Sequence, residues 1–191
     1  MTQPDRIAQI LKHDFQNTAL LEEALTHKSH AVEMGGVDNE RLEFLGDAVL
    51  ELLITEGLMR HFSTASEGQL SRIRASMVRT ESLADLARQC SLGDALRFGK
   101  GEAGTGGADK DTVLAGAFEA LLGALYVDAG LAACREVISA VFGGRILSIE
   151  DPTSFGRDPK SALQEEAMAR VKCMPIYQEV DVTGPPHQRT Y

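Results

Sequence analysis

The strongest pattern of hydrophobic and polar positions lies in the stretch from Asn39 to Leu53, NERLEFLGDAVLELL. On a helix with about 100° per residue, its first three acids gather within about 60° of one another, and four apolar residues gather on the opposite face. The acids are Glu40, Glu43 and Asp47, and the apolar residues are Leu42, Leu45, Val49 and Leu52. The stretch therefore predicts an amphipathic helix with one face toward a core and the other toward something cationic.

The acidic face of this helix has two interpretations. Three carboxylates this close raise one another's pKa and cost stability unless a cation holds them. A solvated polar face is the ordinary alternative for acids at helical spacing. Phe44 lies beside the acids rather than among the leucines, and an aromatic side chain next to a polar face indicates a surface for a partner.

Apolar stripes at helical spacing predict further helices along the chain. They cover 4–12, a segment that begins at Asn17 or Thr18 and ends near THKSH, 66–80 with Ser66 before its first turn, 81–89, 111–128 and 131–149. The Gly-rich residues 99–109 predict a flexible loop. A phosphate-binding loop is not expected there, because the GxxxxGK(S/T) order is missing and no predicted strand precedes the segment. No convincing strand pattern occurs before residue 150, so this part of the chain is expected to be all-helical.

The helix predicted over 111–128 carries one carboxylate on a face of small residues. Its apolar face holds Leu114, Phe118, Leu121, Leu122 and Leu125, and the opposite face holds Thr112, Gly116, Glu119 and Gly123. Small residues permit close approach of another helix or a ligand. Glu119 is therefore a second candidate for an acidic site.

A change of composition at residues 150–158, with Asp-Pro pairs at each end of EDPTSFGRDP, predicts a linker. Residues 159–191 then form a separate unit, in which Lys160 to Val171 predict a helix and IYQEVDVTG alternates as a strand does. Too few residues follow for a sheet that is stable alone, so this α/β unit is expected to be incomplete.

Composition excludes several classes of protein. The chain has 191 residues, 43% of them hydrophobic, which suffices for one domain and a small appendage. Cys90, Cys134 and Cys173 are widely spaced and without a CxxC pair, so we expect reduced thiols and neither disulfides nor a zinc site. No membrane helix or signal peptide is expected, nor an organic cofactor, and the predicted location is cytoplasmic.

The net charge of −9 argues against a general binder of nucleic acids. An acidic protein can still cut nucleic acid where divalent metals neutralise its site and the contact surface is locally basic. The clearest basic cluster is Arg72, Arg74 and Arg79, which predicts either solvated, salt-bridged side chains or phosphate contacts. His27 and His30 are three residues apart, and we expect them to pack or form hydrogen bonds rather than to bind metal.

Several segments together resemble the ribonuclease III family. The segment NERLEFLGDAVL resembles its signature, and ALTHKS, EGQLSRIRASMV, GKGE and LAGAFEALLGALYVD occur around it in the family's order. DPKSALQE and GPPH resemble the start of a double-stranded RNA-binding domain. The resemblance implies an all-α endonuclease domain over 1–149 that forms a homodimer, followed by an incomplete α/β double-stranded RNA-binding domain over 159–191.

The same resemblance implies roles for individual residues. It implies metal-dependent hydrolysis of phosphodiesters in double-stranded RNA, such as ribosomal RNA precursors, with Mg²⁺ as the metal and Mn²⁺ as a possible substitute. The implied metal ligands are Glu43, Asp47 and Glu119, and the implied catalytic residues are Asp47, Glu119, Glu40 and Glu67. The implied RNA-binding residues are Gln164, Glu165 and His187, and the basic cluster adds Arg72 and Arg74 as candidates for RNA contact. Phe44 is implied to pack into the other subunit.

One departure from the family pattern concerns Gly116. The family carries an Asp three residues before the acid that matches Glu119, one helical turn away on the same face. Asp111 lies on the same predicted helix but about 80° from the direction of Glu119, so we do not expect it to replace the missing ligand. Weaker metal affinity and slower cleavage are the expected consequences, together with an intact fold.

Two other functions compete with an active nuclease. A double-stranded RNA-binding homodimer that does not cut is favoured by Gly116 and by the incomplete second unit, but retention of the other acids opposes it. A helical metal-storage or redox bundle would need Glu-x-x-His pairs on facing helices, and the sequence contains none.

Overall fold

The computed structural model describes residue 11, residues 13–153, residue 155 and residues 159–177. The chain divides into two compact units, Met1–Phe155 and Gly156–Tyr191. The helices of the first unit are α2 (Thr18–Ala24), α3 (Lys28–Met34), α4 (Glu40–His61), α5 (Glu67–Val78), α6 (Thr80–Gln89), α7 (Lys100–Gly104) and α8 (Asp111–Leu147), with the short 3-10 helices η1 (Leu92–Ala95) and η2 (Gly107–Asp109). The second unit contains α9 (Pro159–Val171).

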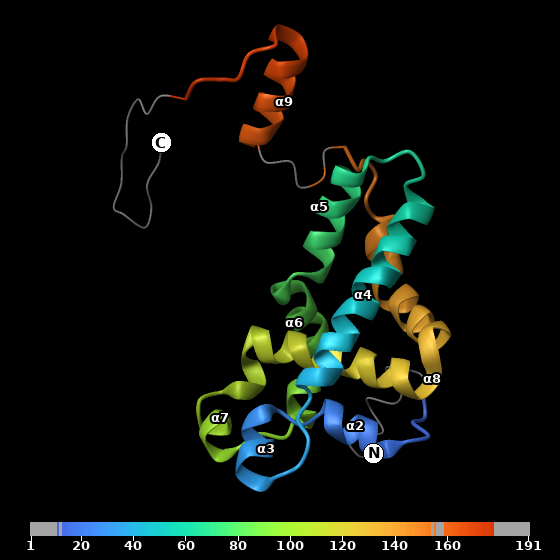
Figure 1. The fold of residues 1–191 in the computed structure, drawn as a ribbon, viewed down its shortest axis with the longest axis vertical. Coiled ribbons are helices and arrows are strands. Elements are labelled where there is room, and N and C mark those ends of the chain that lie inside the picture. Colours follow the sequence, from blue (N-terminus) through green and yellow to red (C-terminus); the bar gives the residue numbers. More distant parts are fainter. Residues whose placement is uncertain (1–10, 12, 154, 156–158, 178–191) are drawn as a thin grey trace. The chain divides into compact units, whose positions relative to one another are not determined.

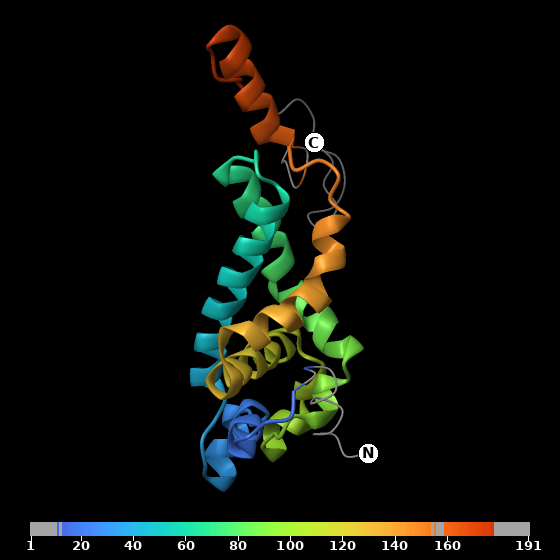
Figure 2. The same ribbon diagram turned by 90° about the vertical axis from the view of Figure 1, so that its right-hand side faces the viewer.

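Helices α4 and α8 form the centre of the first unit, and α4 crosses the first half of α8 in Figure 1. The core is lined by fully buried side chains of both helices, including Leu50, Ile54 and Leu58 of α4 and Leu114, Leu122, Leu125 and Phe142 of α8. Gly130 has a positive φ of 77° and is not helical, so α8 consists of two helices that meet at a kink there. The turn between the two parts is visible in Figure 2, and it separates the two helices predicted over 111–128 and 131–149.

The crossing of α4 and α8 depends on two glycines. A Cβ atom added to Gly46 would lie 1.7 Å from the backbone oxygen of Glu119, and one added to Gly123 would lie 2.1 Å from the backbone oxygen of Leu42. The two helix backbones therefore touch, and no side chain fits between them. This close approach fixes which turns of the two helices face each other.

Replacing Gly46 by Ala is expected to lower the free energy of unfolding by about 3 kcal/mol, because its methyl group would overlap the α8 backbone. Gly143→Ala is the matched control, since an added Cβ there meets nothing within 4 Å and should instead raise stability by up to about 1 kcal/mol. Urea unfolding of the three proteins measures both effects. Equal stability of Gly46→Ala and its parent would contradict this account of the crossing.

Most predicted helices of the first unit are confirmed. Asn17 caps α2 by accepting a hydrogen bond from the backbone N–H of Ala19, at 3.1 Å. Ser66 caps α5 in a capping box with Gln69. Apart from one isolated bridge between Thr26 and Arg97, the described residues form no β structure, which agrees with the expected all-helical endonuclease domain.

Helix α2 ends at Ala24, close to the end expected near THKSH, and Thr26 forms the bridge with Arg97 before α3 begins. Two expectations about local structure differ from the result. The Gly-rich loop contains α7 and η2. Leu52, expected in the core, is 47% exposed, because the buried face of α4 is centred on Leu42, Val49 and Leu53. The helix predicted over 4–12 lies almost wholly outside the described residues.

The second unit contains α9 as expected from Lys160 to Val171. The predicted strand is not formed at Ile176 and Tyr177, and its remainder lies outside the described residues. Within this unit the hydroxyl of Tyr177 donates a hydrogen bond to the backbone oxygen of Lys160, at 3.3 Å. The α/β character of the second unit therefore stays a prediction.

Helix α8 is long and apolar enough, by length and composition, to cross a membrane, which we did not expect from the sequence. Half of its most apolar window is buried inside the protein. That burial, and the many core residues that α8 supplies, identify it as the central core helix of the first unit.

Candidate metal centre

The acidic face of α4 is held in place by the residues that begin the helix. The backbone N–H of the buried Asn39 donates to the backbone oxygen of Thr26 at 2.9 Å, and its side-chain amide donates to that of Ala24 at 3.3 Å. The carboxylate of Asp38 accepts a hydrogen bond from the backbone N–H of Glu40, at 3.1 Å. These contacts tie the first turn of α4, and the acids on it, to the region after α2.

The glycine crossing brings Glu119 of α8 against Asp47 and Glu43 of α4. Burial raises the pKa of Glu119 to about 7, and the negative charges of Asp47 and Glu43 contribute to the same shift. Burial also raises the pKa of Glu43, helped by the charge of Glu40. The three acids expected from the sequence to act together, Glu43, Asp47 and Glu119, therefore form one electrostatically coupled group, called the acidic centre below.

Glu40 lies at the edge of the acidic centre and has a positively charged neighbour. The Lys28 ammonium forms an ion pair with its carboxylate at 3.1 Å, and both side chains are mostly exposed. A groove of about 250 Å³ runs between α3, α4 and the start of α8, lined by His27, Lys28, Asn39, Glu40, Glu43, Thr112 and Val113. The acidic centre therefore borders an open groove that also presents a lysine and a histidine.

Gly116 faces the acidic centre, as its spacing from Glu119 predicted. A Cβ added there would lie 2.7 Å from Oε2 of Glu43. Asp111 is turned elsewhere, because its carboxylate pairs with the guanidinium of Arg88. The expectation that Asp111 would not replace a ligand at position 116 agrees with this pairing.

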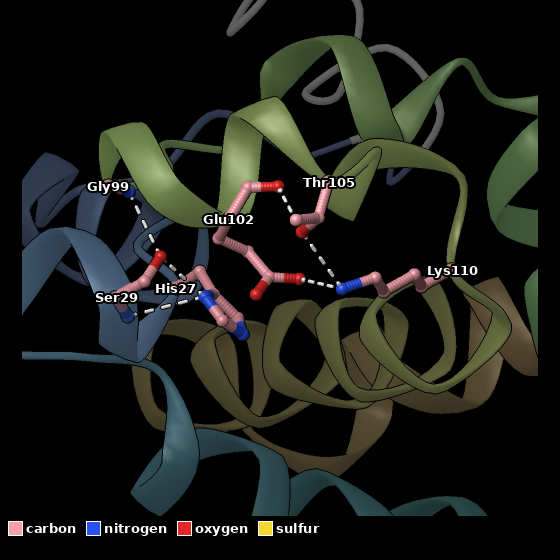
Figure 3. Close-up of polar contacts among 6 residues, drawn as sticks. All are labelled: His27, Ser29, Gly99, Glu102, Thr105 and Lys110. Carbon is pink, nitrogen blue, oxygen red and sulfur yellow. Dashed lines mark hydrogen bonds and ion pairs between the residues drawn. The ribbon is translucent and has the colours of Figure 1, made fainter.

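His27 borders the groove, and Figure 3 shows the polar contacts that hold it at the start of α3. Its Nδ1 accepts a hydrogen bond from the backbone N–H of Ser29 at 3.2 Å, and the hydroxyl of Ser29 accepts one from the backbone N–H of Gly99 at 2.9 Å. Burial lowers the pKa of His27, although the nearby charge of Glu102 opposes this. Nδ1 is thus an acceptor, and the remaining proton of the neutral ring lies on Nε2.

Residues near Gly99 form a further set of polar contacts. The ammonium of Lys110 donates to the carboxylate of Glu102 at 2.8 Å and to the hydroxyl of Thr105 at 3.2 Å (Figure 3). Nδ1 of His30 lies 3.3 Å from the backbone oxygen of Phe98. The two histidines are therefore packing and hydrogen-bonding residues, as expected. No pattern along the chain indicated that His27 and Lys28 border the acidic centre.

Comparison with known proteins decides the family. The sequence profile of the Ribonuclease-III-like family matches residues 17–145. Ribonuclease 3 of Pseudomonas paraeruginosa is 46% identical over 187 residues, which cover 98% of this chain and 80% of the relative. The chain belongs to the ribonuclease III family. Ribonuclease 3 of Magnetococcus marinus is similar as well, with 42% identity over 98% of this chain and 78% of its own length.

Solved structures agree with the assignment to ribonuclease III. The crystal structure of the nuclease domain of ribonuclease III from Campylobacter jejuni matches with a TM-score of 0.71 and 36% identity, over 78% of this chain and all of that domain. Dicer from Pichia stipitis matches with a TM-score of 0.57 and 26% identity, over 91% of this chain and 78% of that one. The chain is accordingly a ribonuclease III-type endonuclease with an all-α nuclease fold.

Glu67, the fourth candidate catalytic acid, is not part of the acidic centre in the single chain. It lies in a separate groove of about 400 Å³ between α4 and α5, lined by Thr55, Leu58, Met59, Glu67, Leu70, Ser71 and Arg74. Thr55 follows Asp47 by eight residues, which is about 12 Å along a helix. The Glu67 carboxylate accepts a hydrogen bond from the hydroxyl of Ser71, at 2.7 Å.

The two arginines expected to contact RNA also lie on α5. Arg74 donates a hydrogen bond to the hydroxyl of Thr55 at 3.0 Å and forms an ion pair with Glu51 at 3.7 Å. In this structure Arg74 is therefore a salt-bridged side chain, which is one of the two predicted alternatives. The Nε atom of Arg72 is buried without a hydrogen-bond partner. Phosphate contact by either arginine stays a prediction.

The RNA-binding residues expected in the second unit are only partly described. Gln164 is half-buried on α9, and Glu165 belongs to the same helix. His187 lies outside the described residues. Their expected contacts with RNA stay predictions.

The donor chemistry of the acidic centre fits a hard divalent cation, because Glu43, Asp47 and Glu119 supply carboxylate oxygens on facing helices. Among the described residues, however, no three His, Cys, Asp or Glu side chains converge closely enough to hold a metal ion as they stand. The side chains of the acidic centre would have to turn toward one another to ligate an ion.

Proposed function

We propose that this chain hydrolyses phosphodiester bonds in double-stranded RNA at the acidic centre, with Mg²⁺ or, in its place, Mn²⁺. The observation that carries the proposal is the coupling of Glu119 to Asp47 and Glu43 across the α4–α8 crossing. Burying repelling carboxylates costs stability, and a cation between them offsets that cost. The relatives named Ribonuclease 3 support the same reaction.

In this proposal each side chain of the site has a separate role. Glu43, Asp47 and Glu119 would hold the metal, which supplies activation of water and stabilisation of charge on the reacting phosphate. Glu40 would orient Lys28 at the mouth of the groove through their ion pair. Lys28 and the Nε2 proton of His27 would present donors to the RNA backbone, which an acidic protein requires near its site.

The proposed substrates are structured precursors such as ribosomal RNA. Gly116 is expected to weaken metal affinity and to slow cleavage, because three carboxylates attract a dication less strongly than four. A cytoplasmic location, which the sequence predicts, suits this substrate. It stays a prediction.

We further propose that the chain acts as a homodimer through α4. Phe44 is 82% exposed, and Met59 and Leu52 are 60% and 47% exposed. At about 100° per residue these three side chains fall on one stripe about 80° wide, next to the acidic face. A related structure of the Campylobacter jejuni domain is described as showing structural flexibility in a region involved in dimer formation.

Replacing Phe44 by Asp is expected to weaken self-association at least about 30-fold, because a buried aromatic anchor would be exchanged for a charge. Val32→Asp is the control, since Val32 is equally exposed at 85% but lies on α3 outside the stripe. Sedimentation equilibrium over a range of concentrations measures both. A Phe44→Asp protein that associates as tightly as its parent would rule out this stripe as the interface.

The competing function is a double-stranded RNA-binding homodimer that does not cut. Mobility shift of a duplex RNA in EDTA, followed by addition of Mg²⁺ to the same complex, separates the two. The proposed function predicts binding in EDTA and fragments after Mg²⁺ is added. Stable binding without fragments would establish the competing function.

A further inference from the structure

The surroundings of Gly116 differ from those of the glycines at the helix crossing. The three atoms nearest to a Cβ added at Gly116 all belong to the carboxyl group of Glu43, with Oε2 at 2.7 Å, Cδ at 2.8 Å and Oε1 at 3.1 Å. At Gly46 and Gly123 the corresponding atoms are backbone atoms. The α4–α8 backbone contact therefore excludes a side chain at Gly46 and Gly123, whereas the nearest obstacle to one at Gly116 is the side chain of Glu43.

This contact defines a place for a carboxylate. Gly116 is buried within α8, and the missing side chain leaves a notch in the helix surface one turn before Glu119. The carboxyl group of Glu43 lies in that notch, so a side chain from α4 reaches the backbone of α8. A long glutamate side chain on a half-exposed surface loses rotamer freedom when it is confined in this way.

We propose that Gly116 is a seat for the carboxylate of Glu43, and that Glu43 thereby takes the ligand position on α8 that residue 116 does not supply. The inference rests on the proposed metal centre for its ligand role. The contact itself does not depend on a metal. In the proposed metal centre Glu43 would then ligate from this seat, with Asp47 and Glu119 turning toward it, and Gly116 is a positioning residue without a side chain of its own.

The seat has a consequence for substitutions at position 116. A methyl group there would lie within 3.1 Å of all three carboxyl atoms of Glu43, so the carboxylate of Glu43 has to shift from its seat, although alanine offers no ligand and adds no charge. Gly116→Ala therefore tests the seat without changing the number of carboxylates. Glu43→Ala empties the seat and supplies the second arm of a double-mutant cycle.

The first measurement uses the full chain in EDTA and records thermal unfolding. Gly143→Ala lies on the same helix with nothing within 4 Å of its added Cβ and should raise Tm by about 2–4 °C through helix propensity alone. Gly116→Ala should give no such gain in the parent but should give it when Glu43 is already alanine. An equal gain in both backgrounds would overturn the seat.

The second measurement is Mn²⁺ binding, followed by the electron paramagnetic resonance signal of the free ion without RNA. Gly116→Ala and Glu43→Ala should each weaken binding about tenfold or more, and the double variant should bind no more weakly than Glu43→Ala. Unchanged Mn²⁺ affinity in Gly116→Ala would overturn the ligand role of a seated Glu43. If neither the parent nor Asp47→Asn binds Mn²⁺, the proposed metal centre fails, and the ligand role of Glu43 fails with it.

Discussion

Replacing Glu119 by Gln is expected to reduce RNA cleavage about 1000-fold while making the metal-free protein more stable at pH 8. The activity is lost because an amide cannot replace a charged ligand or hold a cation against the other two acids. The stability rises because the parent carries a half-buried carboxylate beside Asp47 and Glu43. One substitution thus separates what the acidic centre contributes to function from what it costs the fold.

The pH dependence of the stability effect has a definite sign. The folded-state pKa of Glu119 is about 7, above its ordinary value of 4.5, so the folded protein binds the proton more tightly than the unfolded chain. This contribution is fully present below pH 4.5 and is lost as the pH rises through 7. After discounting for solvent exposure, the loss is on the order of 1–2 kcal/mol.

Urea unfolding in EDTA at pH 5 and pH 8 measures this effect. The Glu119→Gln variant should exceed its parent in stability at pH 8 and approach it at pH 5. Glu136→Gln is the matched control, because Glu136 lies exposed on the same helix and should change neither cleavage nor the pH profile. A stability difference that is the same at both pH values would contradict the burial of a charged Glu119.

Replacing Gly116 by Asp is expected to raise the cleavage rate at about 1 mM Mg²⁺ by about 10–100-fold, because it adds a fourth carboxylate to the metal centre. The metal-free protein should become less stable, since the new side chain displaces the carboxyl group of Glu43 and adds a further negative charge. The concentration of Mg²⁺ at half-maximal rate should fall accordingly.

Gly116→Asn is the control for this prediction, because asparagine has nearly the shape of aspartate without its charge. It should displace Glu43 and give no gain in cleavage. Single-turnover rates over a Mg²⁺ titration compare the three proteins. Equal rates for the parent and Gly116→Asp at every Mg²⁺ concentration would show that position 116 does not limit the metal centre of this chain.

Much of the first unit could be predicted because local patterns and packing agree there. The acidic and apolar faces of α4, the capping by Asn17 and Ser66 and the division of α8 near Gly130 are all visible in the sequence. The Gly-rich segment was interpreted as a loop because glycines disfavour helices. Local hydrogen bonds, such as that between Thr105 and Glu102, nevertheless accompany a short helix there.

The candidate site was predictable in its residues and less so in its geometry. Helical spacing places Glu43 and Asp47 on one face of α4, and it places Glu119 on the face of α8 opposite its apolar residues. Two glycines, Gly46 and Gly123, then set how the two helices cross. The seating of Glu43 at Gly116 depends on a rotamer and on the distance between two helices, which periodicity does not contain. The separation of Glu67 from the acidic centre is likewise a matter of tertiary structure.

The most direct test of the proposed function is single-turnover cleavage of a 5′-end-labelled perfect RNA duplex by the parent protein at pH 7.5 and low salt. Mg²⁺ and then Mn²⁺ are titrated, and a single-stranded RNA of the same sequence is run beside the duplex. We predict discrete fragments from the duplex alone, dependent on the metal and stopped by EDTA. A folded protein that binds the duplex and yields no fragments at any concentration of either metal would contradict the account.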